Sequence, residues 1–278
     1  MYWTLSEPLS IERLTIAIAD LPAQLSGTKL VQLSDFHYDG LRLSEQQLIE
    51  VIARSNQENP DLVLLTGDYV TDDPTPIKAL ATKLKDLSSK LGIYASLGNH
   101  DIYYPHSRLE VTQALTQVGI TVLWNAIAYP LGPEFPLVGL ADFWSGEFKP
   151  SIVLSQIADS TPRLVLSHNP DTAAILKQWR VDLQLSGHTH GGQIVIPGLG
   201  PAPVIIQKIR NNTPNIIHPW IPFLKECSNV AINWQWAQGW HQIGRNQLYV
   251  NRGLGTYFPG RISCPPELTV ITLVSHNG

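Results

Sequence analysis

The 278-residue chain has few cysteines, few charged side chains and no long apolar run. Its two cysteines, Cys227 and Cys264, are too few for a disulfide scaffold and are typical of a reducing compartment. No stretch approaches the about 20 consecutive apolar residues that span a bilayer, so the sequence predicts no transmembrane helix. The N-terminal residues also lack the basic start and apolar core of a secretory signal. These absences predict a cytoplasmic protein.

The composition excludes several further classes of protein. Charged residues make up 15% of the chain, and the formal net charge is −4 at pH 7. This weakly acidic balance argues against nucleic acid as a partner, because proteins that bind a polyanion usually present a basic surface. Gly and Pro number 20 and 21, too few for a disordered or collagen-like chain. The composition therefore indicates a globular protein that buries a core.

Strand-like and helix-like segments alternate over the first two thirds of the chain. Ser44 and Gln47 form a capping box that predicts a helix through about Asn56. Apolar residues at helical spacing predict a second helix from Ile77 to Leu91, with Gly92 as its C-terminal cap. We predict further helices at 107–118 and 171–179, and strands at 29–34, 61–66, 93–97, 120–123, 136–140, 163–167, 181–186, 248–251 and 268–274. This alternation predicts an α/β fold in which strands lie between helical layers.

Residues 194–245 depart from this pattern. They hold many of the prolines and four tryptophans, namely Trp220, Trp234, Trp236 and Trp240. No charge run or Ser-rich linker marks a boundary, so we predict one domain over residues 1–278 with residues 194–245 as an insertion. The apolar side chains of the insertion allow two interpretations. They form either a satellite core under a long loop, or a lid that accepts an acyl chain or contacts a membrane interface.

Polar clusters end five of the predicted strands. They are Asp35-Phe36-His37, Gly67-Asp68, Gly98-Asn99-His100-Asp101, Ser167-His168-Asn169 and Gly187-His188-Thr189-His190. Ligands of open α/β sheets gather at the carboxyl ends of strands, and alternation along an extended backbone lets Asp35 and His37 face one centre. Carboxylate, amide and imidazole groups together suit Mn²⁺, Zn²⁺ or Fe²⁺. The clusters therefore predict a metal site.

The number of candidate ligands points to two divalent ions. The seven candidates are Asp35, His37, Asp68, Asn99, His168, His188 and His190. Seven are too many for one ion and suit two ions that share a bridging group, most simply Asp68. Two such ions clamp a phosphoryl oxygen and activate a water. His100, next to the candidate ligand Asn99, stays available as a general acid for the leaving oxygen.

The ordered motifs Asp-x-His, Gly-Asp, Gly-Asn-His-Asp, His and Gly-His-x-His, from Asp35 to His190, resemble the calcineurin-like metallophosphoesterase superfamily. The resemblance implies a layered β-sandwich flanked by helices. It also implies that one ion is held by Asp35, His37, Asp68 and His190, and the other by Asp68, Asn99, His168 and His188. The residue that matches the family's proton donor is His100.

Longer strings resemble one branch of this superfamily, which contains bacterial phosphodiesterases and the UDP-2,3-diacylglucosamine pyrophosphatases of lipid A synthesis. These strings are LSDFHYDG, PDLVLLTGDYV, LGNHD, LSHNPD, DLQLSGHTHGGQ, NRGLG and CPPE. The resemblance implies a hydrolase of phosphodiester or pyrophosphate bonds that acts on a phosphorylated small molecule or a lipid-linked nucleotide. Many members of the branch have an N-terminal membrane anchor, which this sequence does not show. We therefore expect at most a peripheral contact with the inner membrane, through residues 194–245.

Two alternatives to this function stay open. One is a general phosphodiesterase or phosphomonoesterase, and the other is a non-catalytic binding module on the same scaffold. Loss of ligands would favour the binding module, but none of the seven is missing.

Several neighbouring polar residues have a structural interpretation beside a functional one. Asp101 is more typical of a supporting or turn group than of a ligand, and Asp72 precedes Pro74 as in a turn. Asp142 lies at the end of a predicted strand, where it either lines the pocket or makes structural hydrogen bonds. Arg261 fits a phosphate contact and a surface salt bridge equally well.

Overall fold

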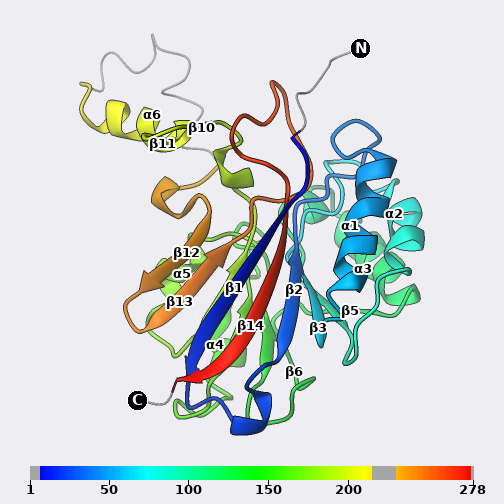
Figure 1. The fold of residues 1–278 in the computed structure, drawn as a ribbon, viewed down its shortest axis with the longest axis vertical. Helices are drawn as coiled ribbons and strands as arrows, with labels where there is room; N and C mark the ends of the chain where they lie inside the picture. Colours follow the sequence, from blue (N-terminus) through cyan, green and yellow to red (C-terminus); the bar gives the residue numbers. More distant parts are fainter. Residues whose placement is uncertain (1–6, 215–229, 277–278) are drawn as a thin grey trace.

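The computed structural model describes residues 7–214 and 230–276, and its centre is a pair of six-stranded sheets (Figure 1). The first sheet has the order β1 (Ser10–Ala19), β14 (Glu267–His276), β2 (Lys29–Leu33), β3 (Leu62–Leu65), β4 (Ile93–Ala95) and β5 (Ile120–Val122). The second has the order β12 (Gly239–Ile243), β13 (Asn246–Val250), β9 (Leu183–Ser186), β8 (Leu164–Leu166), β7 (Leu137–Gly139) and β6 (Ala126–Ala128). Parallel pairing joins β2 through β5, and likewise joins β7, β8, β9 and β13.

Alternate residues of these strands fill the space between the two sheets. Leu62 and Leu64 of β3 share one buried cluster with Leu164 of β8 and Leu183 of β9. Val63, between the two leucines of β3, belongs instead to the cluster under the helices. Because both faces of the parallel strands are buried, their sequences read as continuous apolar runs.

Helices cover the outer faces of both sheets. They are α1 (Glu45–Gln57), α2 (Ile77–Leu84) and α3 (Ser107–Gln117) on the first sheet, and α4 (Pro150–Leu154) and α5 (Thr172–Leu176) on the second. The predicted cap of α1 is confirmed, since the Ser44 side chain accepts a hydrogen bond from the Gln47 amide at 3.1 Å. The predicted layered α/β fold, a β-sandwich flanked by helices, is likewise confirmed.

The structure corrects two of the expected elements in the first sheet and its helical layer. The helix predicted from Ile77 to Leu91 ends at Leu84, and Leu91 is exposed. Gly92, with φ +111°, therefore lies in the turn into β4 and does not cap a helix. The N-terminal strand β1 was not predicted, although its apolar and polar side chains alternate as in a strand with one open face.

The region around the predicted insertion contains regular structure. Within residues 194–245 lie β10 (Val195–Ile196), β11 (Gly200–Pro201), α6 (Ala202–Asn211), a 3-10 turn η5 (Trp234–Trp236) and the edge strand β12. The short elements α6, β10 and β11 sit together at one end of the molecule (Figure 1). The described part of the chain also contains the 3-10 helices η1 (Ala23–Leu25), η2 (His100–Ile102) and η3 (His190–Gly192).

The tryptophans of this region have different surroundings. Trp234 is buried in a small cluster with Ala231 and Ala237, and Trp236 packs against a cluster formed by α5 and β13. Trp240 is about half exposed, at 49%. Trp220 lies outside the described residues, as does Cys227. Trp234 and Trp236 therefore both fit the satellite-core interpretation. Trp234 also lines the cavity described below.

Candidate metal centre

The carboxyl ends of parallel strands from both sheets lead into one group of polar side chains. Asp35 and His37 follow β2, Asp68 follows β3, Asn99 follows β4, His168 follows β8, and His188 and His190 follow β9. Six of these seven side chains are buried, and Asn99 is half-buried. The structure thus brings together all seven residues that the sequence singles out.

The backbone at these residues is unusual. Five of the seven have positive φ values, namely Asp35 (52°), His37 (42°), Asp68 (56°), His188 (73°) and His190 (50°). The expected reason for their convergence is therefore wrong, because they do not lie on extended strands with alternating side chains. They lie in turns just beyond the strand ends, in a conformation that costs about 1–3 kcal/mol for a residue with a side chain. Such strain clusters at functional sites.

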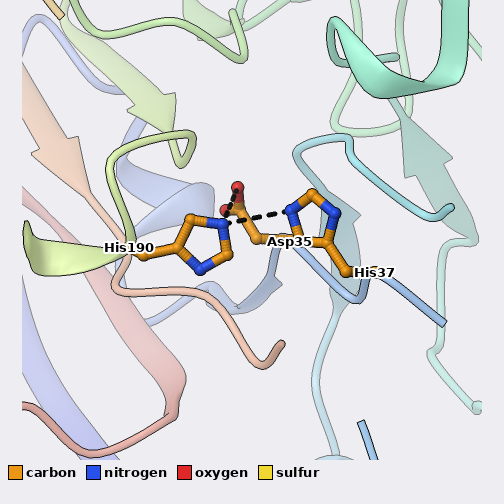
Figure 2. A group of neighbouring side chains, drawn as sticks. All are labelled: Asp35, His37 and His190. Atoms are coloured by element: carbon orange, nitrogen blue, oxygen red, sulfur yellow. Dashed lines mark hydrogen bonds and ion pairs between the residues drawn. The ribbon is translucent and has the colours of Figure 1, made fainter. Parts of the chain in front are cut away.

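One group of candidate ligands consists of Asp35, His37 and His190, whose potential ligand atoms lie within 4.8 Å of one another. Figure 2 shows their side chains pointing at a common point. The Nε2 atoms of His37 and His190 are 3.1 Å apart, and His190 Nε2 is 3.6 Å from Asp35 Oδ1. This group joins the first sheet to the second.

A second group consists of Asp68, His168 and His188. His168 Nε2 lies 3.1 Å from Asp68 Oδ2 and 3.2 Å from His188 Nδ1. The same Asp68 oxygen is 3.5 Å from His37 Nε2, so this carboxylate lies between the two groups. Asn99 Oδ1 is buried and has no hydrogen-bond partner among the described residues.

Backbone carbonyls fix the tautomers of three of the histidines. His168 Nδ1 faces the Thr66 carbonyl at 2.7 Å, His188 Nε2 faces the Val230 carbonyl at 2.7 Å, and His190 Nδ1 faces the Gly255 carbonyl at 3.1 Å. A carbonyl oxygen only accepts, so each of these nitrogens carries the proton. When such a ring is neutral, its opposite nitrogen, which faces the centre, has a lone pair. Lone pairs set this close to one another and to Asp68 need a cation between them, so the residues fit a metal site.

The electrostatics of the centre favour a positive charge beside Asp68. Burial holds the pKa of His37 and of His188 down at about 3, so both rings are neutral at physiological pH. Burial also lowers the pKa of His168, but the adjoining Asp68 carboxylate outweighs it and raises this pKa to about 10. Burial, together with Asp68, raises the pKa of Asp35 to about 6. Such raised pKa values are expected in a cation site, because a bound proton supplies the positive charge that the buried carboxylates favour.

Two glycines allow the strand ends to approach this closely. A Cβ on Gly98 would overlap the Asp68 carboxylate, and a Cβ on Gly187 would overlap Ser34 Oγ and Asp35 Oδ2. Gly98 and Gly187 are therefore required for space, whereas Gly67, before Asp68, has a positive φ of 96° and also lacks room for a Cβ.

Asp101 supports the loop that carries Asp68. Its buried carboxylate accepts hydrogen bonds from the backbone N–H groups of Asp68 and Gly98 at 2.8 Å, and from those of Tyr69 at 2.8 Å and Val70 at 3.3 Å. Burial and the nearby Asp68 charge raise the pKa of Asp101 to about 7, while the backbone donors act in the opposite direction. Asp101 therefore supports a turn, as the sequence indicates.

We expect Asp101→Asn to lower the free energy of unfolding by about 2–3 kcal/mol, because the amide leaves buried N–H donors without an acceptor. Urea unfolding of the variant measures this loss. Asp73→Asn is the matched control, since Asp73 accepts from the Thr75 N–H but on an exposed turn. The control is expected to change stability by less than about 0.5 kcal/mol. Equal stability of both variants and the native chain would contradict the supporting role of Asp101.

His100 lies at the edge of the centre, half-buried. Its Nδ1 donates to the Thr71 carbonyl and lies 3.2 Å from Asp72 Oδ1. Burial lowers the pKa of His100. Asp68, the Thr71 carbonyl and Asp72 together raise it by more than burial lowers it, so this pKa lies above its ordinary value. Among the described residues, Nε2 of His100 has no hydrogen-bond partner, although the ring also comes close to His37 and Asp68. Sequence reasoning placed Asp72 in a turn and missed this contact.

Arg261 has neither of its expected roles. It is buried, with 1% of its surface exposed, and its guanidinium donates to the backbone carbonyls of Arg252, Gly253, Gly255 and Cys264. All of these contacts lie within the loop after β13. Arg261 therefore holds that loop in place, which excludes a surface salt bridge and leaves no room for phosphate.

Of the two expected interpretations of Asp142, the structure supports the structural one, because Asp142 does not line the cavity described below. Its Oδ1 accepts from the Trp144 N–H at 2.9 Å, which is a structural hydrogen bond. Its Oδ2 is buried and has no partner within the described ranges. Burial raises the pKa of Asp142 to about 6, against the opposing effect of His168.

A cavity of about 730 Å³ opens above the centre. Asp68, Asn99, His188 and His190 line it on the polar side, together with His100. The cavity is also lined by the apolar side chains of Trp144, Pro203, Val230, Trp234 and Phe258, and the Trp144 ring lies 4.8 Å from that of His188. The cavity therefore joins the candidate metal centre to an apolar wall, most of which comes from the region after residue 194.

Buried imidazole lone pairs around a shared carboxylate, open to a substrate-sized cavity, define a metal-dependent hydrolase. Residues 28–192 match the family described as Calcineurin-like phosphoesterase, and the chain belongs to this family. It is accordingly a metal-dependent hydrolase of phosphoester bonds.

Several curated proteins resemble the chain over nearly its full length. Phosphodiesterase YaeI of Escherichia coli is 31% identical, over 98% of this chain and 92% of its own. The uncharacterized metallophosphoesterase YkuE of Bacillus subtilis is 33% identical, over 98% of this chain and 88% of its own. UDP-2,3-diacylglucosamine pyrophosphatase LpxG of Chlamydia muridarum is 27% identical, over 95% of this chain and 88% of its own. No helix within residues 7–214 and 230–276 has the length and apolar character needed to cross a membrane.

Proposed function

We propose that the protein hydrolyses the phosphodiester or pyrophosphate bond of a lipid-linked nucleotide. The observation that carries this proposal is the cavity, which places an apolar wall beside the candidate metal centre. A substrate with a phosphoryl group and an acyl chain would use both sides of it. The similarity to LpxG, whose name states such a substrate, supports the same assignment.

We propose that two divalent ions bind in the centre. Asp35, His37, Asp68 and His190 would hold one, and Asp68, Asn99, His168 and His188 the other. The mixture of nitrogen and oxygen donors favours Mn²⁺, Zn²⁺ or Fe²⁺. Bound ions of this kind polarise the phosphoryl oxygens and generate the attacking nucleophile. The unpartnered Asn99 oxygen and the facing imidazole nitrogens support these ligand sets.

His100 would protonate the leaving oxygen. The Thr71 carbonyl fixes a proton on Nδ1, which leaves Nε2 as the nitrogen that gives a second proton away. Asp72, 3.2 Å from Nδ1, stabilises the positively charged ring. Since His100 also lines the cavity, it reaches the substrate.

The apolar residues at one end of the molecule support a peripheral contact with the cytoplasmic face of a membrane. Residues 194–245, which we propose to be an insertion in a single domain, contain four basic residues and one acidic residue, Glu226. Leu199 and Phe258 are exposed by 66% and 74%, and Phe258 also lines the cavity. Sedimentation with vesicles tests this contact. We expect binding to vesicles that contain anionic lipid, and an absence of binding at low salt would contradict it.

Turnover on two substrates tests the proposed function. UDP-2,3-diacylglucosamine and bis(p-nitrophenyl) phosphate are compared in one preparation whose metal content is measured. We expect turnover of both, with the lipid substrate strongly preferred in kcat/KM. Turnover of the small diester alone would favour a general phosphodiesterase. Two bound ions without turnover of any phosphoester would favour the non-catalytic binding module.

Phe258→Ser is expected to raise KM for the diacylated substrate about 10–100-fold, because burial of an aromatic side chain against an acyl chain contributes about 1.5–3 kcal/mol. Kinetics on bis(p-nitrophenyl) phosphate are expected to stay unchanged, since this small diester reacts at the polar side of the cavity. Tyr129→Ser is the control, because Tyr129 is an exposed aromatic that does not line the cavity. Equal changes on both substrates would remove the apolar wall as a reason for preferring a lipid.

A further inference from the structure

The loop after β13 folds over the candidate metal centre and brings Tyr257 against His37. The Tyr257 hydroxyl lies 3.0 Å from His37 Nδ1, and the two rings meet edge to face at 4.9 Å. The Tyr257 N–H donates to Gln193 Oε1 at 2.7 Å. Arg261 donates to the carbonyls of Arg252, Gly253 and Gly255, and so holds the backbone that precedes Tyr257.

Arg42 and His190 also hold the ring of Tyr257. The Arg42 guanidinium lies 4.4 Å from its centroid, and Arg42 is itself anchored by an ion pair with Asp39. The Thr256 N–H donates to the Arg42 carbonyl at 2.9 Å, which ties the two segments together. The His190 ring packs edge-on against Tyr257 at 5.3 Å. Tyr257 is therefore a fixed group and not a mobile wall of the cavity.

His37 differs from the other histidines of the centre in the partner of its outer nitrogen, the ring nitrogen that faces away from the centre. His168, His188 and His190 each point that nitrogen at a backbone carbonyl, whereas His37 points it at the Tyr257 hydroxyl. A hydroxyl accepts a hydrogen bond as a carbonyl does. When it accepts from His37 Nδ1–H, the lone pair stays on Nε2, which faces His190 and Asp68.

We propose that Tyr257 is the positioning residue for His37, and through it for the ion held by Asp35, His37, Asp68 and His190. The inference rests on the proposed two-ion centre. Groups of this kind orient a metal-bound histidine, and their removal typically costs 10–100-fold in metal affinity. No comparable contact joins Tyr257 to His168 or His188, so the effect is confined to one ion.

The test is a calorimetric titration of Mn²⁺ into chelator-treated protein, for the native chain and for Tyr257→Phe. The variant keeps the ring under Arg42 and removes only the oxygen. We expect one of the two binding events to weaken 10–100-fold and the other to stay unchanged. The melting temperature of the metal-free variant should match that of the native chain. Tyr103→Phe, at a residue that is 63% exposed, controls for loss of a tyrosine hydroxyl elsewhere.

The outcomes separate this inference from the proposed function. If the native chain binds fewer than two ions, the two-ion centre itself is wrong. If the native chain binds two ions and Tyr257→Phe binds both with native affinity, the centre stands and the positioning role of Tyr257 is overturned. Equal weakening of both events would also overturn it, because the Tyr257 hydroxyl that the variant removes contacts His37 and neither His168 nor His188.

Discussion

Asp68→Ala is expected to abolish binding of both metal ions and to leave no turnover above background. The Asp68 carboxylate lies 3.1 Å from His168 Nε2 and 3.5 Å from His37 Nε2, so it belongs to both groups of candidate ligands. Without it, the group with His168 and His188 has no carboxylate, and the group with His37 and His190 keeps only that of Asp35 to offset a cation. Elemental analysis of the purified variant measures the loss. Two ions still bound would rule out the bridging role.

Asp72→Ala is the matched control for this experiment. Asp72 is also an aspartate beside the centre, but its carboxylate contacts His100 and belongs to neither ligand group. We expect this variant to keep both ions. Loss of metal from both variants would indicate that the region as a whole is disrupted, and would remove the special role of Asp68.

The second large effect is expected for His100→Ala. This variant should retain both ions and lose about 10²–10⁴-fold in turnover, which is the usual contribution of a general acid. Metal content and kcat are measured on the same sample. A fall in metal content would make His100 a ligand, and its closeness to His37 and Asp68 makes that a concrete alternative.

The choice of leaving group sharpens this test. A poor leaving oxygen needs a proton as the bond to phosphorus breaks, whereas p-nitrophenolate leaves with little help. The loss caused by His100→Ala should therefore be larger for an alkyl diester than for bis(p-nitrophenyl) phosphate. An equal loss on both substrates would contradict proton donation by His100.

The elements that the sequence predicts well are those whose local pattern agrees with their burial. Leu62–Leu65 reads as a buried strand because it is covered on both faces, and α1 begins where Ser44 caps it. The elements that it predicts poorly depend on distant partners. β1 is held by its pairing with β14, and α2 stops at Leu84 although apolar residues continue at helical spacing.

The residues of the candidate site likewise divide into those that the sequence pattern reveals and those that depend on distant contacts. The seven proposed ligands stand out because the residue types and their order are visible along the chain, and the structure brings them together. Arg42 and Tyr257 carry no such signal, and the sequence suggests other roles for Arg261, because their contacts with the centre arise only when the loop after β13 folds back over β2. Sequence reasoning finds the groups that do the chemistry more readily than those that hold them.

The position of β14 has a consequence for how the chain is made. β14 lies between β1 and β2, and its ladder with β1 runs from Ser10 beside Glu267 to Ala19 beside His276. It is the last strand of either described sheet in chain order, so β1 has no partner in the first sheet until residues 267–276 have been made. The first sheet therefore closes late, by joining segments that are far apart in the chain, which is a slow type of folding step. During that interval the unpaired edges of β1 and β2 are the surfaces that a chaperone would have to shield.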